Sequence, residues 1–502
     1  MKGSTLPEDM KLYRYELVEI LLKAGIPLAK VDMLRPFLEK YGHRLTARSH
    51  LSEFIPLISK KEKELLKKEI AAADGFSVIF DGSTRLGEAL AIVVRFVYEQ
   101  YKVQQRLIRL EVLARSLNAE QLAQRLIQCL AVDYGITPPH LLAAMRDGAA
   151  VNEAALRQIG FYFPNVFNVK CFSHTIDNAG KHFEFSVLDT FSRYWSTMFA
   201  LSPAARLAWK TKTGTSMKLK SDTRWWSLFE VLDLVSKYYG DVEPFLREND
   251  LSPMCRAKLL EIFDDPEATR DLEMELAAMI DAGRHFVCAT YYLEGDGPLV
   301  FSCYERLSTL AHAIAIEAYP NAEAKARQHA GVNHALYNQL IAKAKDCINP
   351  GFQYFQRKFS VEFRSTVRAF KAARLCCPVK VQELHPNAAS VQALKEFGFF
   401  SDGEIAGLVQ ELPNYLASAD GTVCESEDDK VRWWSDHVNA LPNWSAATKK
   451  ILLVQPSSAS AERVFSMLQN AFNHQKDGAL EETLEVSVML RYNGNKRNNA
   501  EV

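Results

Sequence analysis

Residues 76–83 have the sequence FSVIFDGS, and they mark a change in the pattern of the chain. Before them, apolar residues recur at helical spacing, whereas Phe76 to Phe80 form a mostly apolar run that ends at Asp81. A short run of this kind, after a turn signal such as Asp74-Gly75, is typical of a buried β-strand. The sequence therefore predicts a strand that ends at an acidic residue.

The pattern after this strand predicts further extended segments and then a helix. Residues 90–101 and 103–113 are two more extended runs, so three strands follow one another. Asn118 with Gln121 fits a capping box, which predicts that a helix begins there.

Two more strands complete the predicted sheet. Residues 141–145 form a fourth strand that leads to Asp147, residues 151–159 form a helix, and residues 166–169 form a fifth strand. The order β-β-β-α-β-α-β is the layout of a ribonuclease-H-like fold, a mixed sheet flanked by helices, with acidic residues at neighbouring strand ends.

The rest of the chain is predicted to be helical. Helical periodicity covers residues 12–41 and 59–73 before the sheet, and almost all of residues 175–412 after it. Turn signals interrupt this long block at Gly240, Pro253, residues 295–298 and residues 349–351. A polar, acidic loop at residues 418–430 separates the block from the C-terminal part.

The composition is that of a folded protein with several cooperating units. The 502 residues are 48% apolar and 24% charged, so a sizeable core is expected. The 60 basic and 61 acidic residues give a net charge of −1, so any contact with nucleic acid must come from local basic patches. Nine cysteines without a C-x-x-C pair indicate reduced thiols inside the cell, and no apolar run is long enough for a membrane span.

Asp81 and Asp147 are the first candidate catalytic residues. Each follows an apolar strand, where a carboxylate can bind a metal ion without being buried unpaired. Two such acids at adjacent strand ends can hold a pair of Mg²⁺ ions. Each also has a structural alternative, because Asp81-Gly82 is a common turn pair and Asp147 suits the N-cap of a helix.

Cys171 and His174 form a C-x-x-H pair where the fifth strand leads into a helix. Half of a ligand set binds zinc weakly, and no partner pair lies nearby in the sequence. The preferred interpretation is therefore a buried cysteine and a hydrogen-bonded histidine that shape the turn.

One segment combines cations with aromatic side chains. Lys218, Lys220 and Arg224 can contact phosphates, and Trp225 can stack on an exposed base. Trp226 follows directly, and adjacent residues of a helix point to different sides, so at least one of the two tryptophans is expected in a core.

Residues 457–466, SSASAERVFS, combine a run of small residues with the start of an amphipathic helix. Glu462 falls in the first turn of that helix, against a tightly packed neighbour. A glutamate at this position also compensates the helix dipole, and for this segment alone that alternative is preferred.

Together and in this order, these segments resemble the hAT transposase family. The specific matches are DGST at residues 81–84, Asp147 followed by CFSHT at residues 171–175, TRW at residues 223–225, and above all residues 457–466. Looser similarity at residues 24–27, 293–296 and 482–493 extends the resemblance over nearly the whole chain.

The resemblance implies a ribonuclease-H-like domain that is interrupted by a large all-helical insertion, so that the last catalytic acid comes from far downstream. It assigns Asp81, Asp147 and Glu462 as the metal-binding triad for two Mg²⁺ or Mn²⁺ ions. It makes Cys171 and His174 a structural pair beside the active site.

The resemblance also implies roles for other parts of the chain. It makes Trp225 the aromatic residue that supports flipped or hairpinned DNA, and it places a dimerisation region at residues 433–492. The expected regions are an N-terminal helical region (1–73), the first part of the ribonuclease-H-like domain (74–200), an all-helical insertion (201–430), and a C-terminal dimerisation region that completes the ribonuclease-H-like domain (431–502).

The implied function is that of a Mg²⁺-dependent DNA transposase that cleaves DNA strands, forms hairpins and transfers strands. The expected partners are DNA and further copies of the chain, in a homodimer or higher oligomer, with no membrane. Family members commonly begin with a zinc-binding finger, and no such pattern precedes Asp81. The chain is therefore a shortened copy, or it uses a separate protein to recognise transposon ends. A nuclear location follows from this function alone, because no clear import signal is present.

Two other functions are compatible with the same sequence. A domesticated, catalytically inactive relative would act as a dimeric DNA-associated scaffold or regulator. The missing finger and Arg146, a bulky cation directly before Asp147, favour this alternative. A stand-alone nuclease of the same fold would not need the long helical insertion or the dimerisation region.

Overall fold

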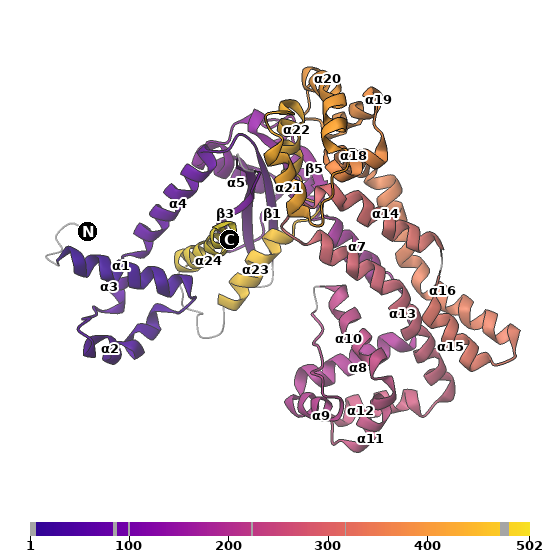
Figure 1. Cartoon of the computed structure of the whole chain (residues 1–502). Coiled ribbons are helices and arrows are strands. Elements are labelled where there is room, and N and C mark those ends of the chain that lie inside the picture. Colours follow the sequence, from indigo (N-terminus) through magenta and orange to yellow (C-terminus); the bar gives the residue numbers. More distant parts are fainter. Residues whose placement is uncertain are drawn as a thin grey trace. The chain divides into compact units, whose positions relative to one another are not determined.

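The computed structural model describes residues 7–83, 88–98, 101–221, 224–316, 318–471 and 481–501. The chain forms two compact units, whose elements are labelled in Figure 1. The first unit consists of Met1–Cys171, Glu294–Phe301 and Arg368–Val502, and the second consists of Phe172–Leu293 and Ser302–Val367. The sheet lies in the first unit, whereas the second unit is helical throughout its described elements.

A five-stranded mixed sheet forms the centre of the first unit. Its strands are β1 (Phe76–Ser83), β2 (Glu88–Val97), β3 (Val103–Leu113), β4 (Leu141–Arg146) and β5 (Phe167–Lys170). Their order in space is β3-β2-β1-β4-β5. The pairs β1–β2 and β2–β3 are antiparallel, whereas β1–β4 and β4–β5 are parallel. The predicted succession of three strands, helix, strand, helix and strand is confirmed, and so is the α/β class.

Helices α5 (Ala119–Ile127) and α6 (Ala150–Ile159) cover one face of the sheet. Helix α5 begins as predicted, with a capping box in which the Asn118 side chain accepts from the Gln121 N–H at 2.9 Å and the Gln121 side chain accepts from the Asn118 N–H at 3.2 Å. Val78 and Phe80 of β1 are fully buried in the core with these helices, as the two-residue period of a strand predicts. The π-helical turn η2 (Gln128–Asp133) continues α5.

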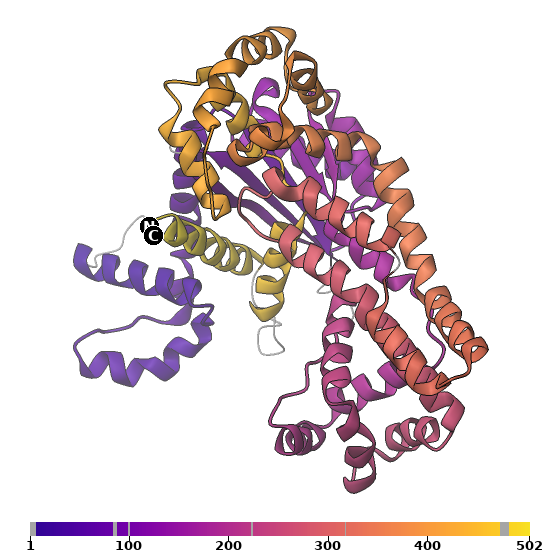
Figure 2. The same cartoon turned by 45° about the vertical axis from the view of Figure 1, so that its right-hand side comes forward.

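The opposite face of the sheet is covered by the C-terminal part of the chain. Helix α23 (Ala459–Ala471) packs on β1 and β2, and α24 (Glu481–Glu501) packs on β3. Figure 2 shows both helices, in yellow, beside the dark strands. Ser77 of β1 belongs to this face, because its hydroxyl donates to the Leu453 carbonyl at 2.6 Å.

Four helices precede the sheet: α1 (Glu8–Lys23), α2 (Val31–Lys40), α3 (Arg48–Ser52) and α4 (Ile55–Ala71). Helix α1 ends at Lys23, and Gly25 adopts a positive φ of 68° directly after it. Apolar residues of these helices share one core with Val486 and Leu490 of α24. The N-terminal helices are therefore joined to the C-terminal helix rather than to the strands that follow them in sequence.

The last segment of the first unit contributes further helices. They are α17 (Arg364–Ala373), α18 (Pro378–Leu384), α19 (Ala388–Val391), α20 (Asp402–Ala419), α21 (Glu427–Asp436) and α22 (Pro442–Leu452). The ring of Tyr415 lies 5.1 Å from that of Trp434 and 4.8 Å from that of Trp444, between ring centroids. This aromatic cluster joins residues on both sides of position 430. The compact sheet unit thus resumes at Arg368, whereas the sequence placed a region boundary at residues 430 and 431.

The second unit is a bundle of helices. They are α7 (Phe172–Lys181), α8 (Val187–Leu201), α9 (Pro203–Thr213), α10 (Trp225–Lys237), α11 (Tyr239–Glu248), α12 (Pro253–Phe263), α13 (Pro266–Leu293), α14 (Val300–Ile316), α15 (Pro320–Ala330) and α16 (His334–Arg357). The unit begins at Phe172, before the expected residue 201, because α7 packs against α13 and α16. No helix within the described ranges, the 28-residue α13 included, is both long and apolar enough to cross a membrane.

The turn predicted at residues 349–351 is wrong, because Pro350 and Gly351 lie inside α16. A Cβ atom on Gly351 would lie 2.4 Å from the Ala179 carbonyl oxygen and 2.5 Å from the ring of Phe183. Glycine is therefore present because α16 approaches α7 closely at this point. Pro350 and Gly351 therefore have the sequence of a turn, although the glycine is explained by packing between two helices.

The other predicted turns have mixed outcomes. The predicted turn is present at Tyr238, which separates α10 from α11, but Gly240 itself lies in the first turn of α11. Pro253 is the first residue of α12, and residues 295–298 connect α13 to α14, as predicted. Proline suits the first position of a helix because the N–H that it lacks would have no partner within the helix.

Candidate active site

The strand register places Asp81 and Asp147 side by side. In the parallel pair β1–β4, the pairing ends with Ile79 opposite Met145, and continuing this register by two residues brings Asp81 to the level of Asp147, which follows β4. Neighbouring strands are about 4.8 Å apart. β1 and β4 are therefore adjacent strands, as predicted, but Asp81 lies within β1, which continues to Ser83, whereas Asp147 directly follows β4.

Cys171 occupies the same level one strand further. Arg146 of β4 lies opposite Lys170 of β5, and the Cys171 N–H donates to the Arg146 carbonyl at 2.8 Å. Cys171 is consequently the neighbour of Asp147 on the side away from Asp81. Asp81 within β1 and the residues directly after β4 and β5 thus place two acids and a thiol in one row.

Asp81 lies on the face of the sheet that the C-terminal segment covers. Side chains alternate along a strand, so Asp81 shares its face with Ser77, whose hydroxyl reaches Leu453. The strand does not end at Asp81 as predicted, because β1 continues to Ser83 beside β2, and Asp81 is only 6% exposed. Asp81 Oδ1 accepts from the Gly82 N–H at 2.8 Å, as in a turn, and Thr84 lies outside the described residues.

Asp147 follows β4 and precedes α6. Its Oδ1 accepts from the Ala149 N–H at 2.9 Å and from the Asn152 side-chain amide at 2.6 Å. Ala149, not Asp147, is the N-cap of α6, but the Asp147 side chain organises the turn that leads into the helix. Asn152 was not singled out from the sequence. An Asp followed by small residues and an Asn five positions later is the signal that would have suggested it.

Arg146 is directed away from the face of Asp81. It follows Met145 and shares the side of Ala144, which belongs to the core with α5 and α6. Its Nη2 lies 3.5 Å from Oε2 of Glu153 on α6, and its Nη1 donates to the Asp147 carbonyl at 2.9 Å. Burial lowers the pKa of the guanidinium, and Glu153 and Asp147 partly oppose this effect. The bulky cation therefore stabilises the strand-to-helix turn.

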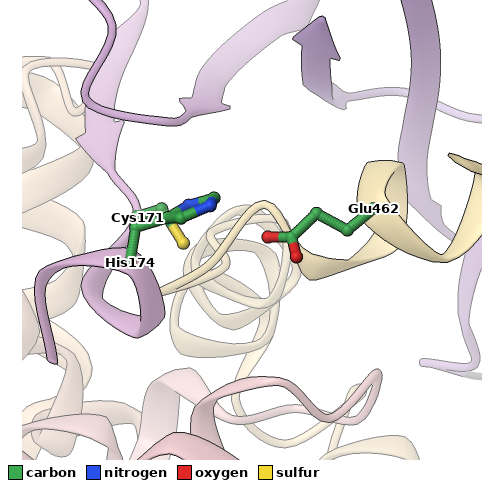
Figure 3. Close-up of side chains that lie close together, drawn as sticks. All are labelled: Cys171, His174 and Glu462. Carbon is green, nitrogen blue, oxygen red and sulfur yellow. The ribbon is translucent and has the colours of Figure 1, made fainter. Parts of the chain in front are cut away.

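Glu462 lies in the first turn of α23, as predicted. A carboxylate oxygen of Glu462 is within 4.8 Å of the Cys171 sulfur, and Figure 3 shows the glutamate directed toward the end of the strand that carries Cys171. The Cys171 sulfur also accepts from the Ser458 N–H at 3.3 Å. Helix α23 thus begins beside the row formed by Asp81, Asp147 and Cys171.

The small residues before Glu462 allow this close approach. Residues 457–461 are each at most 5% exposed. Larger side chains would hold α23 away from the sheet, because protein interiors are close-packed. The prediction that the Ser/Ala run packs tightly against a neighbour is confirmed.

His174 lies in the first turn of α7, three residues after Cys171 (Figure 3). Helix α7 is the first element of the second unit. The burial of Cys171, which is 2% exposed, agrees with the preferred interpretation of a structural cysteine at the strand-to-helix turn. Within the described ranges, Asp81, Asp147 and Glu462 do not form a set whose ligand atoms all lie within 4.8 Å of one another.

The predicted DNA-binding segment divides into an exposed and a buried part. Lys218 and Lys220 are exposed, and Lys218 forms an ion pair with Glu230 at 3.0 Å. Arg224 is half-buried at the start of α10, and Thr223 lies outside the described residues. Lys218 and Lys220 therefore lie at the surface before α10, whereas Arg224 is partly covered.

Trp225 lies in the core of the second unit. It is 8% exposed, and a Cβ atom on Gly180 would lie 2.1 Å from its ring. Its backbone N–H donates to Asp177 Oδ1 at 2.6 Å, and its ring contacts Phe183 edge to face. Stacking on a base requires an open ring face, so Trp225 would have to leave this position to support flipped DNA.

The first unit is thus an α/β protein domain with acidic side chains at one end of a mixed sheet. Residues 414–493 match the family model of the hAT family C-terminal dimerisation region. The C-terminal part of the chain is therefore similar to the dimerisation region of the hAT family, and the resemblance to that family is confirmed there. A search of curated proteins found no match to the chain.

The matched region extends from α20 to α24 and contains Glu462. It begins at residue 414, before the expected residue 433, and thereby includes the aromatic cluster around Tyr415. The match supports self-association of the chain. The matched segment therefore contains both helices that cover the sheet, α23 and α24, and also Glu462, which follows the small Ser/Ala run.

Proposed function

We propose that this chain is a hAT-type, metal-dependent DNA transposase whose sheet unit is a ribonuclease-H-like domain. Asp81, Asp147 and Glu462 are its catalytic residues, and a homodimer or higher oligomer acts on DNA in the nucleus. The observation that carries the proposal is the row of Asp81, Asp147 and Cys171 at one end of the sheet, with the Glu462 carboxylate beside Cys171.

The fold supports this assignment at two points. The sheet has three antiparallel strands followed by two parallel ones, which is the arrangement that the predicted fold requires. A long helical segment then separates β5 from α23, as expected for a domain whose last acid comes from far downstream.

The chemistry of the donor set fits two divalent cations. Carboxylate oxygens are the ligands that Mg²⁺ and Mn²⁺ prefer, and about three carboxylates can neutralise and hold a pair of such ions. Asp81 and Asp147 would bind from neighbouring strands, and Glu462 from α23. When bound, two such ions activate a water or a 3′-hydroxyl and stabilise the leaving oxygen of a phosphodiester.

The protein side chains position the DNA and the acids. Lys218 and Lys220, which are exposed, contact DNA phosphates near α10. Cys171 fixes the start of α23 through the Ser458 amide, and Asn152 holds the Asp147 carboxylate. In hairpin formation and strand transfer, a freed 3′-hydroxyl replaces water as the nucleophile. Its oxygen forms a new bond to phosphorus, and the bridging ester oxygen of the attacked strand leaves.

The test is cleavage of a supercoiled plasmid that carries the genomic DNA flanking both ends of the gene. In Mg²⁺ or Mn²⁺, the wild-type chain is expected to nick and open the plasmid, and Glu462→Gln is expected to reduce the rate about a thousandfold or more. Glu481→Gln, which changes an exposed glutamate at the start of α24, serves as the matched control and should leave the rate unchanged. Equal cleavage by wild type and Glu462→Gln would remove Glu462 from the triad.

A second candidate function is a dimeric, DNA-associated scaffold or regulator without catalysis. The specific observations that favour it are the match confined to the dimerisation region and the engagement of Asp147 Oδ1 by Ala149 and Asn152. Absence of cleavage in both Mg²⁺ and Mn²⁺, together with dimers that still retain DNA in a gel-shift assay, would establish this function and contradict the first.

A further inference from the structure

The loop between α13 and α14 is part of the sheet unit, although most of both helices belongs to the second unit. At its centre, Asp296 faces three cations. Its carboxylate contacts Arg463 of α23 and Lys496 of α24, and the Ser460 hydroxyl donates to its Oδ1 at 3.3 Å. We name this arrangement of Asp296, Arg463, Lys496 and Arg95 the Asp296 cluster.

Arg95 connects the same loop to the sheet. Its Nη1 donates to the Asp296 carbonyl at 2.9 Å and its Nη2 to the Gly297 carbonyl at 3.0 Å, while its Nε donates to the Leu452 carbonyl at 2.9 Å. Arg95 is fully buried on β2, the strand that pairs with β1, and it lies opposite Ser77. The loop is therefore attached to the neighbour of the strand that carries Asp81.

Charges in the Asp296 cluster favour an ionised aspartate. Burial acts to raise the pKa of Asp296, but Arg463, Lys496 and Arg95 outweigh it, so the pKa of this carboxyl lies below its ordinary value. Burial lowers the pKa of Lys496, and Asp296 opposes that shift. A single carboxylate thus compensates several cations that come from separate elements.

Arg463 directly follows Glu462 and holds the loop with two nitrogens. Its Nη1 donates to the Glu294 carbonyl at 2.8 Å, and its Nη2 contacts Asp296 and lies 3.0 Å from the Ser460 hydroxyl. The planar guanidinium fixes a direction as well as a distance, which the ammonium of lysine does not. The first turn of α23 is therefore fixed on both sides of Glu462.

We propose that Asp296, acting through Arg463, is the positioning residue for Glu462. The loop between α13 and α14 sets the rotation of the first turn of α23 and with it the direction of the Glu462 carboxylate. This inference rests on the proposed function, because it assigns a consequence to the position of Glu462. It gives the insertion a role inside the sheet unit that is separate from DNA binding.

The test measures binding of Mn²⁺ alone to the full chain without DNA, by isothermal titration calorimetry, together with thermal unfolding of each variant. Arg463→Lys retains the charge but loses the two-pronged contact, and it is expected to weaken Mn²⁺ binding about tenfold. Glu462→Gln shows how far Mn²⁺ binding weakens when the glutamate that is proposed to bind the metal is itself removed. Arg497→Lys is the matched control, because Arg497 makes a comparable two-pronged contact with Glu69 on the same unit, and it should bind Mn²⁺ like the wild type.

The outcomes separate this inference from the function on which it rests. If Glu462→Gln weakens Mn²⁺ binding and Arg463→Lys does not, the positioning role is overturned and the proposed function stands. If Glu462→Gln binds like the wild type, both fail. Asp296→Asn is a second variant, and if it folds it should weaken Mn²⁺ binding as Arg463→Lys does. If Arg463→Lys and Arg497→Lys weakened Mn²⁺ binding by the same factor, the Asp296 cluster would have only a general structural role, and the proposal would be overturned.

Discussion

The sulfur of Cys171 accepts a hydrogen bond from the backbone N–H of Ser458 at 3.3 Å, across 287 positions of the sequence. The contact joins the residue after β5 to the residue before α23. Helix N-termini have free N–H groups, and a buried acceptor satisfies one of them. The thiol therefore fixes the helix that carries Glu462 at the end of the sheet.

Replacing this acceptor should loosen the start of α23. Cys171→Ala removes both the hydrogen bond and a small buried volume, so we expect the free energy of unfolding to fall by about 2 kcal/mol. Cys255→Ala, at a cysteine that is also 2% exposed but lies in the second unit, controls for lost volume alone. Urea denaturation followed by circular dichroism measures both. An effect of Cys171→Ala no larger than that of Cys255→Ala would show that the sulfur contact contributes nothing.

Gly180 provides the space for Trp225. Because an added Cβ would overlap the indole at 2.1 Å, Gly180→Ala should displace the ring and lower the free energy of unfolding by about 3 kcal/mol. The tryptophan fluorescence maximum should shift to longer wavelength as Trp225 becomes exposed. Gly240→Ala, at a helical glycine with no atom within 4 Å of the added Cβ, is the control and should be neutral or slightly stabilising. Unchanged stability of Gly180→Ala would contradict the described packing.

The local parts of the fold could be predicted from the sequence. The capping box of Asn118 and Gln121 depends on residues three positions apart, and the strand Val103–Leu113 was predicted with its observed bounds. The level pairing of Asp81 and Asp147 followed from the order of the strands, because parallel neighbours end at the same edge. These features depend on short-range signals and on simple rules of sheet topology.

The parts of the fold that were not predicted from the sequence depend on contacts between residues that lie far apart in the chain. Nothing near Gly351 in the sequence indicates that α7 approaches it, so a turn was predicted inside a helix. At least one of the adjacent Trp225 and Trp226 was expected in a core, but the entry of Trp225 into the core depends on Gly180, far away in the sequence. Asp296 was included only in a turn signal and in the looser family similarity at residues 293–296, since its partners Arg463 and Lys496 lie more than 160 positions later.

Buried acids illustrate why a candidate site cannot be chosen by burial alone. Glu275 is 1% exposed, and it accepts from the N–H groups of Val187 and Leu188 at 2.9 and 2.7 Å, at the start of α8. Asp281 accepts from the Asn321 and Ala322 N–H groups at 3.0 Å, at the start of α15. These carboxylates compensate helix N-termini, which carry partial positive charge. Asp81 differs from Glu275 and Asp281 because a second acid, Asp147, lies at its level directly after the neighbouring strand.

Glu69 should make stability depend on pH in the acidic range. It lies between Arg106 and Arg497, and each of its oxygens accepts from both guanidinium groups at 3.0 Å. Burial acts to raise the pKa of Glu69, but the two arginines outweigh it, so the folded-state pKa lies below the ordinary value. Its contribution to stability is therefore complete above about pH 4.3 and is lost as the pH falls through the folded-state pKa.

The measurement compares the wild type with Glu69→Gln by urea denaturation between pH 7 and pH 3.5. At pH 7 the substitution should cost about 2 kcal/mol, and the difference should shrink below about pH 4. Glu64→Gln, an exposed position on the same helix, is the control and should change little at any pH. A difference that stayed constant down to pH 3.5 would show that the charge of Glu69 is not the source of the effect.

Self-association should depend on the region that matches the hAT dimerisation model. Val423, between α20 and α21 within that region, is 84% exposed, and its burial by a partner would remove apolar surface from water. The wild-type chain is expected to sediment at twice 56.7 kDa, and Val423→Asp should raise the dissociation constant of the dimer about tenfold, or about 1.4 kcal/mol. Val332→Asp, at a valine that is 96% exposed and outside the matched region, should leave the dimer intact. Equal weakening by both variants would mean that added charge, and not this surface, controls association, and a monomeric wild type would contradict the dimer itself.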